Sequence, residues 1–231
     1  MNTHGLGPRL RLRIGDLLVR LGLKERPIPN LQGDRDLEWS WMAARIPQGS
    51  GRALDFGCGQ SSFLGLTAAH RGYRVTAVDL TPVRWSYRHR QLEFMQGDVA
   101  HLGLAPNSFD LILNCSTIEH VGLAGRYGSA DRPDGDIEAM TALHSLLKEE
   151  GRMVMTIPVG LDAVFAPFHR VYGKERLALL LSRWSVEWKE FWIKDGTNCW
   201  VKTEESVALN QKSSAVYYGL GFFILRRSAG A

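Results

Sequence analysis

The sequence contains few cysteines, and they form no recognisable motif. The three cysteines, Cys58, Cys115 and Cys199, are odd in number and widely spaced, and no Cys-x-x-Cys pair occurs. This pattern argues against a disulfide framework and against a zinc site built from thiolates. Free cysteines are typical of a reducing compartment, so we expect a cytoplasmic protein.

Long apolar runs are also missing. No stretch approaches the roughly 18 residues that a membrane-spanning helix needs, and charged residues interrupt the leucine-rich start of the chain, unlike a signal peptide. That start, residues 9–23, has the leucine and isoleucine spacing of a basic amphipathic helix. We expect residues 1–35 to form a helical extension that packs on the domain or covers a pocket; binding to a membrane surface is the alternative.

An excess of one charge is absent as well. Lys and Arg number 28 against 24 Asp and Glu, a formal net charge of +4. Nucleic-acid-binding domains usually carry a larger positive excess, gathered in a stripe. The composition therefore favours a small-molecule partner over a nucleic acid, and it leaves the oligomeric state open.

The pattern that is present is an alternation of buried strands and helices from residue 52 onward. Such alternation predicts an α/β domain over residues 36–231, with a mostly parallel sheet and helices on both faces. The last two strands lie close together in the sequence, which indicates an antiparallel edge. The predicted strands cover residues 52–57, 73–80, 91–95, 109–116, 152–159, 185–193 and 216–227, and the predicted helices 36–45, 62–71, 137 to near 151, and 177–184.

The clearest motif is Asp55-Phe56-Gly57-Cys58-Gly59, where a buried strand runs into a Gly-x-Gly turn and then a helix. Glycines let the backbone turn tightly and let a ligand approach it, and ligands bind at the carboxyl ends of such strands. Ser62 replaces the third glycine of the dinucleotide fingerprint. This replacement weighs against an NAD-dependent enzyme, which is the main competing interpretation.

Two further carboxylates follow neighbouring strands. Asp79 ends the second strand, where a carboxylate can accept hydrogen bonds from both hydroxyls of a ribose. Asp98, in Gly97-Asp98-Val99, follows the third strand and can receive the amino group of an adenine. The order of these acids along the chain predicts an adenosine-containing ligand at one edge of the sheet.

Together these motifs resemble the class I S-adenosylmethionine-dependent methyltransferases, over about residues 50–160 and more loosely in the last strands. The Leu-Lys-x-x-Gly-Arg sequence at 147–152 also matches that family. The resemblance implies a Rossmann-like seven-stranded sheet of order 3-2-1-4-5-7-6 and S-adenosyl-L-methionine as cofactor. The residues it assigns to cofactor binding are Asp55, Gly57, Cys58, Gly59, Asp79, Leu80, Asp98, Val99 and Asn114.

The fourth strand is followed by Glu119 and His120, in an x-x-Glu-His-Val sequence that is common in this class. A histidine has the right pKa to take a proton from a hydroxyl at neutral pH. The alternative is that Glu119 and His120 only shape the pocket.

His169 follows the fifth strand at the same edge of the sheet, so Glu119, His120 and His169 are a candidate catalytic and metal-binding set. Such a set suits Mn, Fe, Co or Zn better than Mg, and a bound metal would lower the pKa of an acceptor hydroxyl. Plant small-RNA 2′-O-methyltransferases and quinone-biosynthesis O-methyltransferases have a similar Glu-x-x-Glu-His element. This chain departs from it, because Ser116 stands where the first Glu would be.

The irregular stretch at 122–136 is long enough to predict a functional insertion on the substrate side. Its polar residues, together with Arg170, are the candidate substrate contacts; Asp134 or Asp136 could instead cap the helix that follows. The sequence around it resembles a poorly characterised group of methyltransferase-like proteins that are often encoded near polysaccharide genes. The candidate substrate residues are Arg126, Tyr127, Asp131, Asp134 and Arg170.

These observations predict an O-methyltransferase that acts on a hydroxyl of a small molecule, with a sugar or glycoside as the expected acceptor. The alternatives are N- or C-methylation of another small molecule, and a protein that binds the cofactor without turnover. Methylation of RNA or DNA is disfavoured by the charge pattern.

Overall fold

The computed structural model describes residues 17, 18, 21–23, 34–85, 87–125, 127 and 130–228. It divides the chain into two units, Met1–Gly33 and Asp34–Ala231. The helix predicted over residues 9–23 falls mostly outside the described residues, so its role as a lid or a surface anchor stays a prediction. The structure below is that of the second unit.

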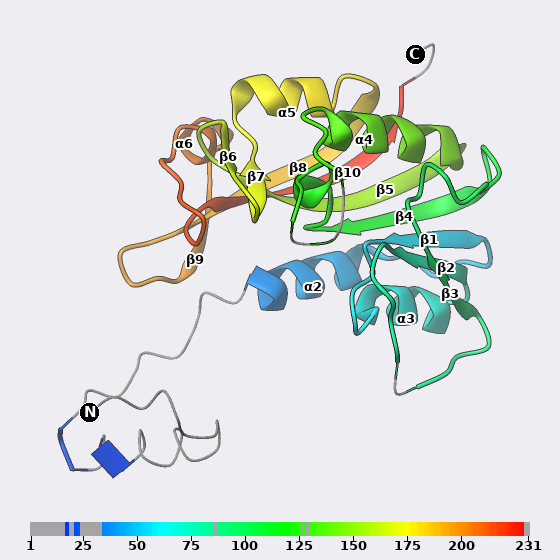
Figure 1. Ribbon diagram of the computed structural model, residues 1–231, viewed down its shortest axis with the longest axis horizontal. Helices are drawn as coiled ribbons and strands as arrows, with labels where there is room; N and C mark the ends of the chain where they lie inside the picture. The colour runs from blue at the N-terminus through cyan, green and yellow to red at the C-terminus, as the bar shows by residue number, and fades with distance from the viewer. Residues whose placement is uncertain are drawn as a thin grey trace. The chain divides into compact units, whose positions relative to one another are not determined.

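The second unit is built on an eight-stranded sheet of order β3-β2-β1-β4-β5-β10-β8-β9 (Figure 1). Strands β1 to β5 run parallel, and β10, β8 and β9 pair antiparallel. The predicted order 3-2-1-4-5-7-6 is confirmed, with β8 as the predicted sixth strand and β10 as the predicted seventh; β9 is an additional edge strand that the prediction did not include. The strands are β1 (Arg52–Phe56), β2 (Arg74–Asp79), β3 (Leu92–Gln96), β4 (Phe109–Cys115), β5 (Leu147–Val159), β8 (Trp184–Lys194), β9 (Trp200–Thr203) and β10 (Gly219–Arg227).

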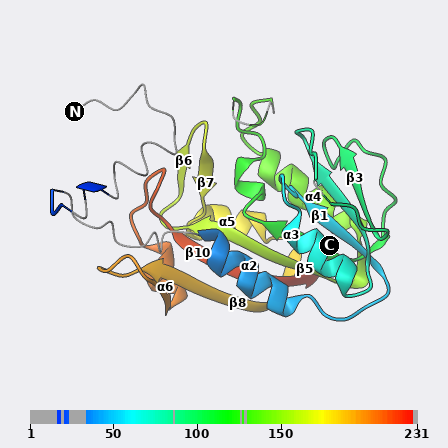
Figure 2. The ribbon, with the colours of Figure 1, turned by 90° about the horizontal axis from the view of Figure 1, so that it is seen from below.

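Helices cover both faces of this sheet, as predicted (Figure 1). Helices α2 (Asp34–Arg45) and α3 (Phe63–His70) lie on one face, and Figure 2 views the molecule from their side. Helices α4 (Gly135–Leu146) and α5 (Lys174–Leu180) lie on the other. The remaining elements are η1 (Ile118–His120), the hairpin β6 (Ala163–Phe165) and β7 (His169–Val171), and α6 (Glu205–Leu209).

Two apolar clusters fill the space between the sheet and its helices. Met153 and Phe223 belong to the cluster on the α4 and α5 face, whereas Phe222 and Val154 belong to the cluster on the α2 and α3 face. Successive residues of a strand face opposite sides of the sheet, so β5 and β10 need apolar residues at almost every position. This explains their continuous hydrophobic runs.

The described part of the chain contains no helix that is long and apolar enough to cross a membrane.

Candidate active site

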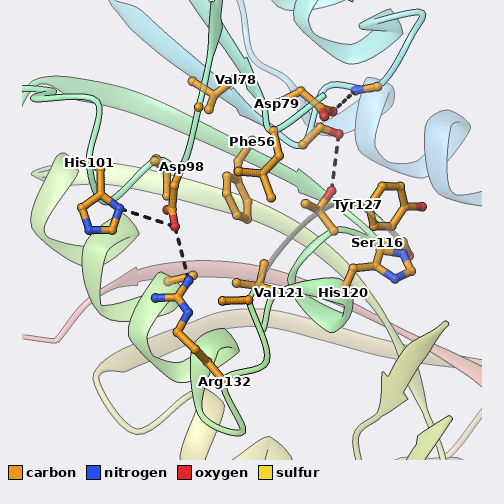
Figure 3. Close-up of a pocket in the computed structure, with 18 of the residues that line it drawn as sticks. Phe56, Val78, Asp79, Asp98, His101, Ser116, His120, Val121, Tyr127 and Arg132 are labelled. Atoms are coloured by element: carbon orange, nitrogen blue, oxygen red, sulfur yellow. Dashed lines mark hydrogen bonds and ion pairs between the residues drawn. The ribbon is translucent and has the colours of Figure 1, made fainter. Parts of the chain in front are cut away.

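A cavity of about 520 Å³ opens at the carboxyl ends of β1, β2 and β4 (Figure 3). This is the edge at which ligands bind in open α/β sheets, and the volume falls within the range of small-molecule sites. A smaller cavity of about 220 Å³ adjoins it and shares three lining residues: Arg35, Gly57 and Gly59.

The turn at Gly57 and Gly59 lines both cavities. Gly57 and Gly59 have left-handed backbone angles, with φ of 68° and 59°. A Cβ on Gly57 would collide with the side chain of Thr117, whereas a Cβ on Gly59 would meet no atom within 4 Å. Gly57 is therefore required for packing, and Gly59 leaves open space where a ligand can lie against the backbone. Cys58 between them is buried and lines the smaller cavity.

Asp55 binds the residues that follow this turn. Its Oδ2 accepts hydrogen bonds from Ser62 Oγ at 2.7 Å and from the Gly65 amide at 3.1 Å, and burial raises the pKa of its carboxyl to about 6. Ser62 stands where the dinucleotide fingerprint has glycine, and it has a left-handed φ of 36°. Its hydroxyl is held by the hydrogen bond to Asp55. Asp55 borders the smaller cavity only.

Asp79 stands at the end of β2 and lines the large cavity. Its Oδ2 accepts the Gly59 amide at 2.9 Å (Figure 3), and its Oδ1 accepts the Thr81 amide at 2.9 Å and hydroxyl at 2.7 Å. These three bonds fix the carboxylate and leave about one of its four lone-pair sites, on Oδ2, for a ribose hydroxyl. Leu80 lines the cavity beside it.

Asp98 lies at the opposite end of the cavity from Ser116 and His120 (Figure 3). Its Oδ1 accepts the Ala100 amide at 3.0 Å, and its Oδ2 lies 3.2 Å from Arg132 Nη2 and 3.6 Å from His101 Nδ1. Val99 lines the cavity next to it. Arg132 belongs to the 122–136 insertion, which therefore reaches the predicted adenine end as well as the acceptor side.

Asn114 does not line the cavity. Its side chain is fully buried in β4, and neither Nδ2 nor Oδ1 has a hydrogen-bond partner among the described residues. The neighbouring Ser116 and Thr117 line the cavity in its place. The sequence located the end of the strand correctly, but it did not fix which side chain faces the cavity.

His120 lies at the end of the cavity away from Asp98, beside the ring of Tyr127 at 5.1 Å between centroids (Figure 3). Its Nδ1 lies 2.5 Å from the carbonyl oxygen of Phe168. Because a carbonyl only accepts hydrogen bonds, this contact assigns the hydrogen to Nδ1 and makes Nε2 the basic nitrogen of the neutral ring.

The predicted metal set is not assembled. The Glu119 side chain is only 2% exposed, its Oε1 lies 3.6 Å from His120 Nε2, and burial raises the pKa of its carboxyl to about 8. The His169 ring is buried and packs against Tyr218 at 4.9 Å, with 6.4 Å to the ring of His120. The described residues include no group of three His, Cys, Asp or Glu side chains that could hold a metal ion.

Arg170 binds the protein itself, which corrects its assignment to the substrate. The side chain is almost fully buried, and its guanidinium donates to the carbonyls of Val121 at 2.5 Å, Arg132 at 3.2 Å and Pro133 at 3.1 Å. With its donors used in this way, Arg170 fastens the end of the insertion.

Of the other candidate substrate residues in the insertion, some line the cavity and others do not. Tyr127 lines the cavity, whereas Asp131 is exposed and Asp134 pairs with Arg176 at 2.8 Å. Asp134 occupies the N-cap position of α4 without a side-chain capping bond. The prediction that Asp134 or Asp136 caps this helix is thus confirmed for the position of Asp134 but not for a side-chain bond. Asp136 is buried and accepts hydrogen bonds from Arg176 and from Tyr172 at 3.1 Å. Arg126 lies outside the described residues.

The sequence did not predict the contribution of α2. Arg35 lines both cavities, and its Nη1 lies 3.0 Å from Glu38 Oε2 and 3.2 Å from the carbonyl oxygen of Cys115. Glu38 is fully buried. A signal was available, because Glu38 shares the apolar stripe of the helix with Trp41 and Met42 at i+3 and i+4, where a charged residue is costly unless it has partners.

Comparisons with known proteins agree with this geometry. Residues 75–219 match a family described as Caenorhabditis protein of unknown function, DUF268. The chain is also 30% identical, over 185 residues, to the ubiquinone biosynthesis O-methyltransferase of Xanthomonas campestris pv. campestris. That match covers 77% of this chain and 71% of the relative.

Solved structures of similar fold include methyltransferases with S-adenosylhomocysteine bound. The 1,6-didemethyltoxoflavin-N1-methyltransferase of Burkholderia thailandensis superposes with a TM-score of 0.53 and 17% identity, over 97% of this chain and 92% of that one. The N-methyltransferase NodS of Bradyrhizobium japonicum superposes with a TM-score of 0.55 and 17% identity, over 89% and 94%. The fold, the cavity and these matches together show that the chain belongs to the DUF268 family and to the class I S-adenosylmethionine-dependent methyltransferases.

Proposed function

We propose that this enzyme methylates a hydroxyl oxygen of a small molecule and that His120 is the base. The observation that carries the proposal is the contact between His120 Nδ1 and the Phe168 carbonyl oxygen. It fixes the tautomer of a histidine whose side chain lines the cavity. The O-methyltransferase activity named for the Xanthomonas relative supports the same reaction class.

The residues that line the cavity suit S-adenosylmethionine. Asp79 would hold a ribose hydroxyl, Asp98 and Val99 the adenine, and Arg35 the carboxylate of the amino-acid part. The open space beside Gly59 leaves room for the ligand against the turn. When bound, the cofactor supplies an electrophilic methyl group on a positively charged sulfur.

His120 would accept the hydroxyl proton at Nε2 while the acceptor oxygen becomes nucleophilic. The Nδ1–H bond to the Phe168 carbonyl holds the ring in place and stabilises the imidazolium that results. Methyl transfer otherwise depends mainly on alignment, which a fixed cavity wall provides.

We propose a hydroxylated ring, such as a sugar or glycoside, as the acceptor. Tyr127 supports this choice, because its ring lies in the cavity wall next to His120 and offers an apolar face against which such a ring can pack. The resemblance of the 122–136 insertion to proteins encoded near polysaccharide genes points to the same class.

The test is to measure S-adenosylhomocysteine formation with a panel of sugars, glycosides, catechols and amines, for the wild type, His120→Asn and His101→Asn. Asparagine can keep a donor near the Nδ1 position while removing the base. We expect His120→Asn to lower kcat by about 10²- to 10⁴-fold with little change in cofactor affinity. His101, at the other end of the cavity, is the control. Full kcat in His120→Asn, or turnover of amines alone, would contradict the proposal.

A further inference from the structure

Helix α2 brings a buried carboxylate to the wall of the cavity. Glu38 Oε1 accepts hydrogen bonds from the hydroxyls of Ser116 and, at 2.7 Å, Thr156, and Oε2 lies 3.0 Å from Arg35 Nη1. Burial raises the pKa of the Glu38 carboxyl, and the Arg35 guanidinium opposes that rise. A buried carboxylate is costly unless donors surround it. Two of its three donors, Arg35 and Ser116, line the large cavity.

Ser116 is held in a conformation that favours glycine. Its φ is 43°, in the left-handed region, at the point where β4 ends. Its amide donates to the Thr156 carbonyl at 3.0 Å and its hydroxyl to Glu38. Such strain persists where the surroundings hold it, and it is frequent at functional sites. This residue turns the chain from β4 toward η1, which carries His120.

Arg35 is oriented by the same carboxylate. Its guanidinium lies between the two cavities, close to the Gly57–Gly59 turn, and its other contacts are to the carbonyl and sulfur of Cys115. A guanidinium there is placed to bind an anionic group of a ligand. Loss of the negative charge on Glu38 would leave the guanidinium without its ion-pair partner in the wall.

We propose that Glu38 is a positioning residue with two effects. Through Arg35 it orients the group that binds the carboxylate of the cofactor, and through Ser116 it holds the turn that places His120. The inference rests on the proposed function, because it says what α2 does for the same cavity.

A purely structural role for Glu38 can be separated from this one. Helix α2 is also fastened to the sheet away from the cavity, where the buried carboxylate of Glu190 accepts a hydrogen bond from Trp41 and another from Trp192 at 3.2 Å. Glu190→Gln is therefore a matched control, since it weakens a buried carboxylate bond to α2 without touching Arg35 or Ser116.

The experiment is a calorimetric titration of wild type, Glu38→Gln and Glu190→Gln with S-adenosylhomocysteine and with 5′-methylthioadenosine, which lacks the carboxylate. We expect Glu38→Gln to weaken S-adenosylhomocysteine binding by about tenfold or more, the size of one charge-assisted hydrogen bond, and 5′-methylthioadenosine binding by less than about twofold. Glu38→Asp should restore part of the difference, and Glu190→Gln should bind both ligands as the wild type does.

Equal losses for both ligands, or the same behaviour in Glu38→Gln and Glu190→Gln, would overturn the inference. Should Glu38→Gln fail to fold, two other variants replace it: Arg35→Gln tests the effect on the cofactor carboxylate, and Ser116→Ala tests the effect on the turn before His120. The first must weaken only S-adenosylhomocysteine, and the second must lower kcat while cofactor affinity is kept. A wild-type protein that binds neither ligand would instead refute the proposed function.

Discussion

At the scale of single residues, Gly57 and Gly59 share a left-handed backbone but differ in surroundings. Alanine at either position adds backbone strain of about 1 kcal/mol, and at Gly57 it also collides with Thr117. We expect Gly57→Ala to lower the melting temperature by several degrees more than Gly59→Ala. Gly59→Ala should chiefly weaken S-adenosylhomocysteine binding, because its methyl group enters the cavity.

Thermal unfolding and calorimetric titration of the two variants check this. A larger loss of stability in Gly59→Ala than in Gly57→Ala would contradict the packing difference, and unchanged S-adenosylhomocysteine binding by Gly59→Ala would show that the open space beside Gly59 is not part of the ligand site.

Glu119 makes the stability of the protein depend on pH. Its folded-state pKa of about 8 lies above the ordinary value of 4.5, so the folded state binds this proton more tightly than the unfolded state. That stabilisation is complete below about pH 4.5 and is lost as the pH rises through about 8. Glu119→Gln removes the titration and should gain on the wild type, on the order of a few kcal/mol, between pH 5 and 8.5.

Denaturant unfolding of both proteins across this pH range measures the difference between their free energies of unfolding. The contributions of the other titrating groups are the same in both proteins and drop out of this difference. Parallel stability curves would mean that Glu119 titrates normally.

From their places after strand ends, the sequence predicted that Asp79, Asp98 and His120 lie at one edge of the sheet, and all three line the large cavity. Glu38 and Arg132 were missed, because their partners, such as Thr156 and Asp98, are distant in sequence and meet only in the folded sheet. For Glu38 a signal was present, since a charged residue stands in the apolar stripe of α2. The prediction failed at Asn114 for a local reason. Side chains alternate between the two faces of a strand, so a shift of one residue moves a candidate away from the ligand.

At the scale of elements, the 122–136 insertion is closed at its base and clamped from β7. The amide of Arg132 donates to the Gly122 carbonyl at 2.9 Å, and Arg170 binds three carbonyls on either side of this closure. This arrangement holds Tyr127 and Arg132 in the wall of the cavity. Arg170 is thus tied to the stability of the insertion.

We expect Arg170→Met to destabilise the protein by on the order of 3 kcal/mol, because buried carbonyls lose charged donors. Lys189→Met, which removes an exposed pair with Glu205, should cost less than about 1 kcal/mol. Denaturant unfolding of the two variants tests the contrast. An Arg170→Met variant of normal stability with a raised KM for the acceptor would restore Arg170 to the substrate site.

The long buried strands were predictable because continuous apolar runs between turn residues identify them. The short elements were not. Strand β9 has four residues and none is buried, and strands β6 and β7 have three residues each. They pair as hairpins with strands next to them along the chain, β6 with β7 and β9 with β8, but such short segments hold too few residues for a strand pattern to be recognised.

At the scale of the whole molecule, the strand order and the cofactor class were both predictable, because the Gly57-Cys58-Gly59 turn and the carboxylates that follow the next strands resemble the motifs of class I methyltransferases, and that resemblance implies both. The acceptor was not, since one fold serves many acceptors and the specificity lies in a few cavity side chains. The central claim is therefore the cofactor, and Asp79 is its most direct probe.

The measurement that tests this claim is a calorimetric titration of S-adenosylhomocysteine and NAD into wild type, Asp79→Asn and Asp110→Asn. Asp110 is the control, because it also accepts a backbone amide, that of Arg52 at 2.8 Å, but it does not line the cavity. We predict micromolar binding of S-adenosylhomocysteine that falls about 10- to 100-fold in Asp79→Asn, the loss of one or two hydrogen bonds to a carboxylate, and is unchanged in Asp110→Asn. No binding by the wild type, tighter binding of NAD, or equal affinity in Asp79→Asn would contradict the account.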